Sequence, residues 1–432
     1  MRSVVSRGAV ALAALLAVVP HGAIALDLQA ALREVATTNP TLASRRAMVE
    51  AARRRVAPAG AWQSPMVEIG ALNVPTNGRF DMEPMTMKMV GIEQRVLVFG
   101  ANRLSRRSAG AAAQAEGAGL EMANYELFSM AWEAYADAYY AGQLAESSLA
   151  HRGEMERLVR SARARYDSGN GRLEDVLRAE AEQARILSDL AAFESEAQGA
   201  RARLAALMGR ESAALADSLE TPPVSSPPED PAAIIAWVNE SHPRLRALRA
   251  QVDRYQLAAR AARRMIWPDL NMSVSYGIRQ PIMGVAQDNM WSATVGFMLP
   301  VFANQRELSE ASEMDAMARA SESDLRAATL DLDQQARSLH ASARADSRTV
   351  SLLADTVVTT QRRAVAASWS AYKAGATDLW RVFEATHALY GEEVALMRAR
   401  QDLARNEARL LAITARGDLF GLTLPEIKRS ER

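Results

Sequence analysis

The fold of this chain is decided by residues 268–300, which read PDLNMSVSYGIRQPIMGVAQDNMWSATVGFMLP. Apolar and polar residues alternate over Leu270–Ile278 and again over Trp291–Leu299. A period of two is typical of β-strands with one apolar and one polar face. Nine tilted residues cover roughly 20–25 Å, the height of the apolar band of an outer-membrane barrel. We therefore expect a hairpin of two amphipathic strands that face a membrane.

The chain contains this sequence pattern twice, at a constant offset of 203 residues. Asn39-Pro40 stands before the first copy as His242-Pro243 stands before the second. The offset also relates Pro65 to Pro268 and Phe99 to Phe302, and it becomes 206 at Tyr166 and Tyr372. Weaker alternating strands occupy Val67–Ala71 and Val90–Val96 in the first copy. We expect two structural repeats of ~200 residues that form one body.

A sheet of a water-soluble protein with one wet face would show the same alternation. The flanking segments favour the membrane interpretation, because they read as long helices that offer no layer to cover a sheet. Four strands per chain cannot close a transmembrane barrel, for which about eight is the lower limit. A strand edge exposed to lipid is not tolerated. The chain must then oligomerise, and a trimer supplies twelve strands.

Long helices are predicted where proline is absent, between Pro84 and Pro222 and between Pro300 and Pro425. These stretches are rich in Ala, Glu, Arg, Leu and Gln, which are strong helix formers. The helix predicted from Ser105 to Ser168 would be ~95 Å long. Turns at Gly169 and Gly375 then lead to second helices, predicted at about Arg172–Met208 and about Asp378–Ala415.

The helix after the first turn has apolar residues at the 3–4 spacing of a coiled-coil seam. The residues of this seam are Leu177, Ala181, Ala184, Leu187 and Ala191. A helical hairpin of this kind is expected to have no core of its own. We expect it to pack on copies of itself.

The chain divides into five segments. Residues 1–25 read as a secretory signal with Arg2 and Arg7, an apolar run of 12 residues and cleavage after Ala25. An N-terminal anchor is the alternative. A first repeat (26–221) and a second repeat (241–416) are joined by a proline-rich link (222–240). Five prolines lie within its residues 222–231, and they exclude a helix over those ten residues. A C-terminal tail covers 417–432.

Composition excludes several classes of protein. The chain has no cysteine, hence no disulfide, thiolate metal site or N-terminal lipidated cysteine. Lys plus Arg and Asp plus Glu are both 51, which argues against a nucleic-acid partner. No nucleotide-binding or hydrolase motif is present. Glu384 and His387 share one helix face, but a single pair of this kind is common by chance. We predict no enzyme activity, no catalytic residue, no resident metal and no cofactor.

The sequence resembles the TolC-like outer-membrane factor family of Gram-negative bacteria. The resemblance rests on the duplicated Asn-Pro and His-Pro openings, on Trp267-Pro268-Asp269-Leu270, on Leu299-Pro300-Val301-Phe302 and on the Tyr-x-x-Gly turns at Tyr166 and Tyr372. It implies a mainly α homotrimer, with a twelve-stranded β-barrel in the outer membrane that is continued by a long periplasmic α-helical barrel. It also implies an equatorial belt, an adaptor (membrane fusion) protein and an inner-membrane transporter as partners. An unlipidated trimer is expected.

The resemblance further implies that the turns form a periplasmic tip with a gate and a docking surface. The docking residues would be Gly169, Gly171, Leu173, Gly375, Thr377 and Leu379. The gate residues would be Asp175, Asp378, Arg381 and Glu384. Relatives carry acidic rings beyond the second glycine, and Arg381 departs from that pattern. A mixed ring could form ion pairs between protomers. The alternative for these four residues is a solvated helix face.

Methionine is frequent, with 19 residues in the chain. The repeat offset assigns Met87, Met89 and Met298 to the lumen side of the strands. Thioethers prefer soft ions such as Cu(I) and Ag(I), and residues 84–89 look like the heavy-metal branch of the family. We expect export of Cu/Ag or Zn/Co cations with an RND pump. Alternative cargoes are drugs or other organic compounds and, for type I secretion, proteins. The methionines could instead simply fill gaps in the packing. A periplasmic adaptor and a coiled-coil scaffold are less favoured classes of protein.

Overall fold

The computed structural model describes residues 25–97, 99–211, 218–223 and 230–424. The predicted signal peptide therefore lies, but for its last residue, outside the described residues. The helices are α1 (Leu28–Thr38), α2 (Pro40–Gly60), α3 (Ala101–Asp167), α4 (Leu173–Leu207), α5 (Pro231–Ser241), α6 (Pro243–Arg264), α7 (Glu307–Leu352), α8 (Thr359–Lys373) and α9 (Leu379–Thr414). The strands are β1 (Met66–Leu72), β2 (Met87–Val96), β3 (Asp269–Arg279) and β4 (Met290–Met298).

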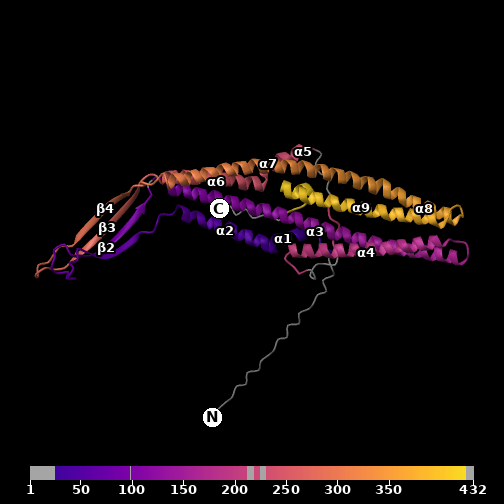
Figure 1. The fold of residues 1–432 in the computed structure, drawn as a ribbon, viewed down its shortest axis with the longest axis horizontal. Helices are drawn as coiled ribbons and strands as arrows, with labels where there is room; N and C mark the ends of the chain where they lie inside the picture. Colours follow the sequence, from indigo (N-terminus) through magenta and orange to yellow (C-terminus); the bar gives the residue numbers. More distant parts are fainter. Residues whose placement is uncertain (1–24, 98, 212–217, 224–229, 425–432) are drawn as a thin grey trace, which may run out of the picture.

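The molecule is an elongated helical body with the sheet at one end (Figure 1). The turn between α3 and α4 and the turn between α8 and α9 lie together at the other end. The short helix α5 lies near the middle of the body, beside α7. Among the helices of the described ranges, none has both the length and the apolar content needed to cross a membrane.

The two repeats begin with the same helix cap. The Asn39 side chain accepts a hydrogen bond from the backbone N–H of Thr41 (2.9 Å). His242 Nδ1 accepts one from the N–H of Arg244 (3.1 Å). In both cases a proline follows at the first helical position, where its missing N–H is no loss. The duplicated dipeptides are therefore helix N-termini, as the sequence predicted.

We expect the buried His242 cap to make the stability of the protein depend on pH. His242 is 5% exposed, and burial lowers its pKa from 6.5 to about 4. Between pH 6.5 and pH 4, His242 takes up a proton in the unfolded chain but not in the folded chain. The free energy of unfolding is therefore highest above pH 6.5. It falls as the pH drops toward 4, by up to about 3 kcal/mol. We expect His242→Asn, which copies the cap of Asn39, to remove this loss. Thermal unfolding of both proteins between these pH values, followed by circular dichroism, checks the prediction; an identical pH dependence would contradict it.

The four strands form one antiparallel sheet in the order β1-β2-β3-β4. Residues directly opposite each other share a face. One row contains Val67, Ile92, Val274 and Ala293. The neighbouring row contains Met66, Glu93, Ser273 and Thr294, on the opposite face. The sheet therefore has one apolar and one mainly polar face, and its strands agree with the predicted ones to within a few residues.

The apolar face of the sheet is exposed in the single chain. Val67 is 63% exposed, Ile92 49% and Val274 44%. Aromatic pairs stand toward its two ends: Tyr276 with Trp291 (centroids 4.9 Å apart), and Phe99 with Trp267 (5.1 Å). An apolar band between aromatic girdles is the pattern of a strand surface in contact with lipid.

The hairpin of α3 and α4 buries its apolar side chains together with other helices of the same chain, whereas the sequence suggested packing on copies of itself. Phe128, Trp132, Tyr135 and Tyr140 of α3 are buried at the centre of a large apolar cluster that includes α1 and α9. A second cluster joins α3, α4 and α9 near the turns. An elongated bundle can bury apolar side chains in sections along its length, and each protomer therefore has several separate cores.

The predicted seam on α4 faces away from its own chain. Leu177 is 56% exposed and Leu187 is 42% exposed. The residues that pack inside the protomer are shifted along the helix to Val176, Ala179 and Ile186. The stripe at Leu177 and Leu187 therefore remains available to another copy of the chain.

Three further local features were not predicted from the sequence. The second half of the proline-rich link is helix α5, because Pro231 occupies its first turn and Asp230 caps it (2.8 Å to the N–H of Ala232). Residues Leu353–Val358 form a π-helical segment between α7 and α8, which no sequence pattern indicated. The first long helix begins at Ala101, four residues before the predicted start.

Candidate functional site

The two turns at the end of the helical body have the same backbone structure. Gly169 and Gly375 both have φ of 71°, a left-handed conformation that favours glycine at the end of a helix. The N–H of Asn170 donates to the carbonyl of Arg165 (2.8 Å), as the N–H of Ala376 donates to that of Ala371 (2.9 Å). These are Schellman motifs, and they explain the glycine of the Tyr-x-x-Gly sequence in each repeat.

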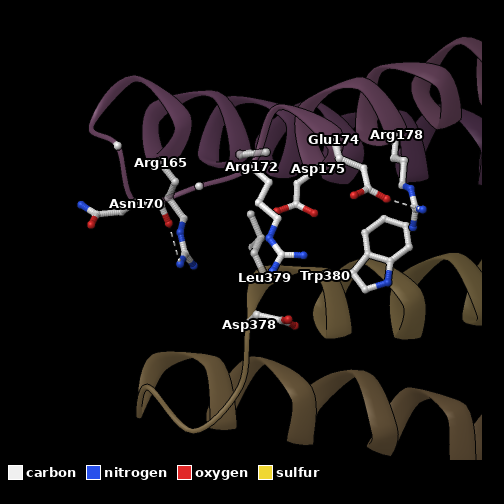
Figure 2. Close-up of a pocket in the computed structure, with 12 residues that line it drawn as sticks. Arg165, Asn170, Arg172, Glu174, Asp175, Arg178, Asp378, Leu379 and Trp380 are labelled. Atoms are coloured by element: carbon white, nitrogen blue, oxygen red, sulfur yellow. Dashed lines mark hydrogen bonds and ion pairs between the residues drawn. The ribbon is translucent and has the colours of Figure 1, made fainter.

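The turns enclose a cleft, which we call the tip cleft (Figure 2). Five of the ten residues predicted for docking or gating line it: Gly169, Gly171, Asp175, Asp378 and Leu379. The other five stand outside this lining, and they are Leu173, Gly375, Thr377, Arg381 and Glu384. The structure thus brings the two turns together, as the sequence suggested, but places the charges of α9 unequally.

Local bonds account for three of the predicted gate residues. The Asp378 carboxylate caps α9 by accepting a hydrogen bond from the N–H of Arg381 (3.1 Å). The Arg381 guanidinium pairs with Glu384 on the same helix (3.2 Å). Both partners are well exposed, at 70% and 47%, so this pair contributes little to stability. In the single chain, Arg381 and Glu384 therefore form a pair within one helix.

Three arginines and a tryptophan in the tip cleft were not predicted from the sequence. Arg165, Arg172 and Arg178 line it together with Trp380. Arg178 forms an ion pair with Glu174, and its guanidinium carbon lies 4.9 Å from the Trp380 ring centroid. Figure 2 shows the side chains of Arg172, Asp175 and Arg178 projecting from one hairpin toward Asp378, Leu379 and Trp380 on the other. The Glu174 and Arg178 spacing of four was a signal for their pair; nothing in the sequence indicated the contact with Trp380.

A polar network beneath the cleft ties the two hairpins together. His151 Nε2 lies 2.9 Å from Glu393, which also accepts a hydrogen bond from Arg362 (2.8 Å). The hydrogen bond to His151 and then that from Arg362 hold the pKa of the Glu393 carboxyl below its usual range. The Tyr390 hydroxyl lies 2.8 Å from that of Ser148. The network connects α3, α8 and α9.

The three methionines predicted for the lumen lie on the polar face of the sheet. Met87 stands opposite Arg279 and packs against Gly277, where a Cβ would approach its sulfur to 2.3 Å. Met89 stands opposite Gly277, on the same face. Met298 pairs with Asp269 at the other end of the sheet, with its sulfur 3.8 Å from Arg95 Nη2. Met87 and Met298 are therefore far apart, and the three thioethers do not form one group.

No metal centre is evident in the described part of the chain, since no three carboxylate or imidazole side chains there are placed to hold an ion. Glu384 and His387 are one helical turn apart, but the His387 ring lies against Glu182 of α4, with 2.6 Å between Nδ1 and Oε1. This contact gives the His387 ring a structural role between two helices.

A helical body that ends in an amphipathic four-stranded sheet, with paired turns at its far end, is the architecture of an outer-membrane channel. The chain belongs to the outer membrane efflux protein family, whose model matches residues 31–210 and 236–416, one match in each repeat. The family resemblance that the sequence suggested is therefore confirmed.

Relatives support the same assignment. Outer membrane efflux protein BepC of Brucella suis biovar 1 is 26% identical over 419 residues, which is 95% of this chain and 90% of BepC. The fold is similar to that of the outer-membrane channel OprN, with a TM-score of 0.73, 19% identity and coverage of 90% and 89% of the two chains. It is also similar to VceC of Vibrio cholerae, with a TM-score of 0.73, 16% identity and coverage of 90% and 95%.

Proposed function

We propose that three copies of this chain form the outer-membrane exit duct of a tripartite efflux pump. The observation that carries this proposal is the sheet. Its apolar face is exposed, and each of its outer strands, β1 and β4, has a strand neighbour on one side only within the described residues. Joining β4 of one copy to β1 of the next would close a barrel of twelve strands and leave no edge in lipid. The helices would continue as a tube in the periplasm.

The far end of the tube would meet the other parts of the pump. An adaptor protein would dock on the tip cleft and on the neighbouring turn residues Leu173, Gly375 and Thr377. Asp175, Asp378, Arg381 and Glu384 would form the charged gate, where three copies of each charge create a strong local field. An inner-membrane transporter of the RND type would supply the cargo. This arrangement assigns transport, and no catalytic step, to the chain.

Heavy-metal cations of the Cu/Ag or Zn/Co type are the proposed cargo. The polar face of the sheet would line the duct, which places Met87, Met89 and Met298 along its wall. Thioethers bind soft cations. Because these methionines stand at separate levels, each would offer a passing contact, and none would complete a binding site. Drug or organic efflux and type I secretion are the alternative cargoes.

The duct and its docking surface can be tested in one strain that lacks the gene. We expect the wild-type gene to restore tolerance to copper, silver, zinc or cobalt, and Leu173→Glu to fail. Leu173 is 49% exposed at the first position of α4, where a carboxylate suits the helix dipole, so the variant should fold. The minimal inhibitory concentration should differ by about tenfold if docking loses ~1.4 kcal/mol or more.

Leu330→Glu is the matched control, because Leu330 is 74% exposed on α7 and far from the turns in sequence. It should restore tolerance fully. Unchanged metal tolerance with new sensitivity to drugs or dyes would replace the metal cargo by organic cargo. A strain with no new sensitivity of any kind would contradict the exit-duct function, and full rescue by Leu173→Glu would contradict the docking surface.

A further inference from the structure

In three segments next to the sheet, every charged residue is an arginine. Residues 51–65, 97–110 and 257–268 together contain nine arginines and no Asp, Glu or Lys, although the whole chain has equal numbers of acidic and basic residues. Each segment supplies three. The arginines are Arg53, Arg54 and Arg55 of α2, Arg103, Arg106 and Arg107 of α3, and Arg260, Arg263 and Arg264 of α6. We call this group the arginine collar.

The fold places the collar at one level of the molecule, immediately below the sheet. The segments adjoin the strand ends that lie together, since Met66 of β1 pairs with Glu93 and Val96 of β2 pairs with Leu270. Asn102 of α3 donates to the carbonyl of Ala61 (3.4 Å). Helices α2, α3 and α6 are therefore neighbours here, as Figure 1 shows.

The collar is within reach of the surface of a membrane that contains the sheet. Its members lie within about seven helical residues of the helix ends, which is roughly 10 Å. The headgroup layer on each side of a hydrocarbon core is roughly 5–8 Å thick. Phe99 and Trp267 stand between the collar and the apolar band, where interfacial aromatic residues are found in membrane proteins. Guanidinium groups just below such aromatic residues would lie at the depth of the lipid phosphates.

Most of the collar is not neutralised by the protein. All nine arginines are exposed. Arg54 pairs with Glu50 (2.8 Å), and Arg263 pairs with Asp315 of α7. Six others have no carboxylate within 4.0 Å among the residues that the structure describes, and they are Arg55, Arg103, Arg106, Arg107, Arg260 and Arg264. The fourth helix at this end, α7, carries the acids Glu307, Glu310 and Glu313, so the basic surface covers three helices of four.

We propose that the arginine collar binds the headgroups of anionic phospholipids at the periplasmic surface of the outer membrane. The inference rests on the proposed function, because it requires the sheet to lie in that membrane. Arginine binds phosphate through two parallel hydrogen bonds and retains its charge at any pH. A phosphatidylglycerol headgroup, with its net negative charge, fits an uncompensated cluster better than a zwitterionic headgroup does. The collar thus anchors the duct at a defined depth and favours anionic lipid around it.

The test compares two quadruple variants of the full-length protein in detergent. The collar variant carries Arg103→Gln, Arg107→Gln, Arg260→Gln and Arg264→Gln, none of which breaks an ion pair among the described residues. The control variant replaces four exposed arginines of α7 and α8, which likewise have no such pair, by Gln. These are Arg319, Arg326, Arg348 and Arg363. Each protein is titrated with dioleoyl phosphatidylglycerol or dioleoyl phosphatidylcholine, and bound lipid per trimer is counted by native mass spectrometry.

We expect the wild type and the control to bind phosphatidylglycerol at least about fivefold better than phosphatidylcholine, since each arginine near a membrane surface contributes a factor of this size. The collar variant should bind both lipids about equally. Replacing the same four residues by lysine should retain most of the preference, and added salt should weaken it.

Two results would overturn the proposal. A collar variant that keeps the wild-type preference would show that these arginines face the inside of the duct. An equal loss in collar and control variants would show an effect of net charge alone. A protein that forms no detergent-soluble trimer would instead contradict the proposed duct, so the two failures are distinguishable.

Discussion

Replacing Val274 by arginine is expected to remove the protein from the outer membrane. Val274 stands at the middle of β3, on the apolar face and between Ile92 and Ala293. An arginine on the lipid face at the middle of a bilayer costs about 2–4 kcal/mol per chain. A trimer carries the substitution three times, and assembly multiplies the effect. We expect the amount of trimer in outer-membrane fractions to fall by at least about tenfold.

Ser275→Arg is the matched control, because the neighbouring residue of a strand points to the opposite face. Ser275 stands between Gly91 and Ser292 on the polar face, at nearly the same depth. This variant should reach the membrane in normal amounts. Quantitative blots of membrane fractions, with light scattering of the extracted protein to measure its size, check both outcomes. Equal recovery of the two variants would mean that the apolar face does not contact lipid.

Replacing Asp137 by alanine is expected to destabilise each protomer by about 3–5 kcal/mol. The Asp137 side chain is 6% exposed and lies inside the helical body. It accepts hydrogen bonds from Arg405 Nε (2.7 Å) and from Gln401 Nε2 (3.0 Å), and Arg203 approaches to 3.5 Å. Without the carboxylate, the Arg405 guanidinium, whose side chain is 31% exposed, would lose its buried counter-ion. The midpoint of thermal unfolding should fall by about 5 °C or more.

One helical turn earlier, Glu133 provides a control of the same kind. It pairs with Arg409 of α9 at 3.2 Å, but Arg409 is 52% exposed. Water solvates such a pair well, so Glu133→Ala should cost less than about 1 kcal/mol. Circular dichroism of the two variants under identical conditions measures the difference. If both lost the same stability, burial would not be what distinguishes the two ion pairs.

Several elements could be read from the sequence because their signals are local. The alternation in Leu270–Ile278 predicted a strand that spans Asp269–Arg279. Proline-free stretches rich in helix formers predicted the long helices, and α4 ends one residue before the predicted boundary at Met208. The cap at His242 and the glycine of each turn were likewise visible, because one residue determines the backbone there.

Other features could not be predicted, since they depend on which residues meet after folding. The spacing of Leu177 and Leu187 suggested a seam, but the helix turns its neighbours Val176 and Ile186 inward. Both sets of apolar residues lie along the same helix, and the sequence alone does not show which set faces inward. The π-helical segment at Leu353–Val358 and the contact of Arg178 with Trp380 also join parts that no local pattern relates.

The sequence by itself determined the duplicated plan, the period of the strands, the length of the helices and the position of the turns. These follow from backbone propensity and from the two periodicities of side chains, which act over a few residues. Only the tertiary structure decided which faces pack, which charges are buried and where the arginines gather. Asp137 and Arg405 are 268 positions apart, and only the packing of α9 against α3 makes one the counter-ion of the other. Such pairings carry no local signal, because their energy arises from contacts that exist only once the helices are side by side.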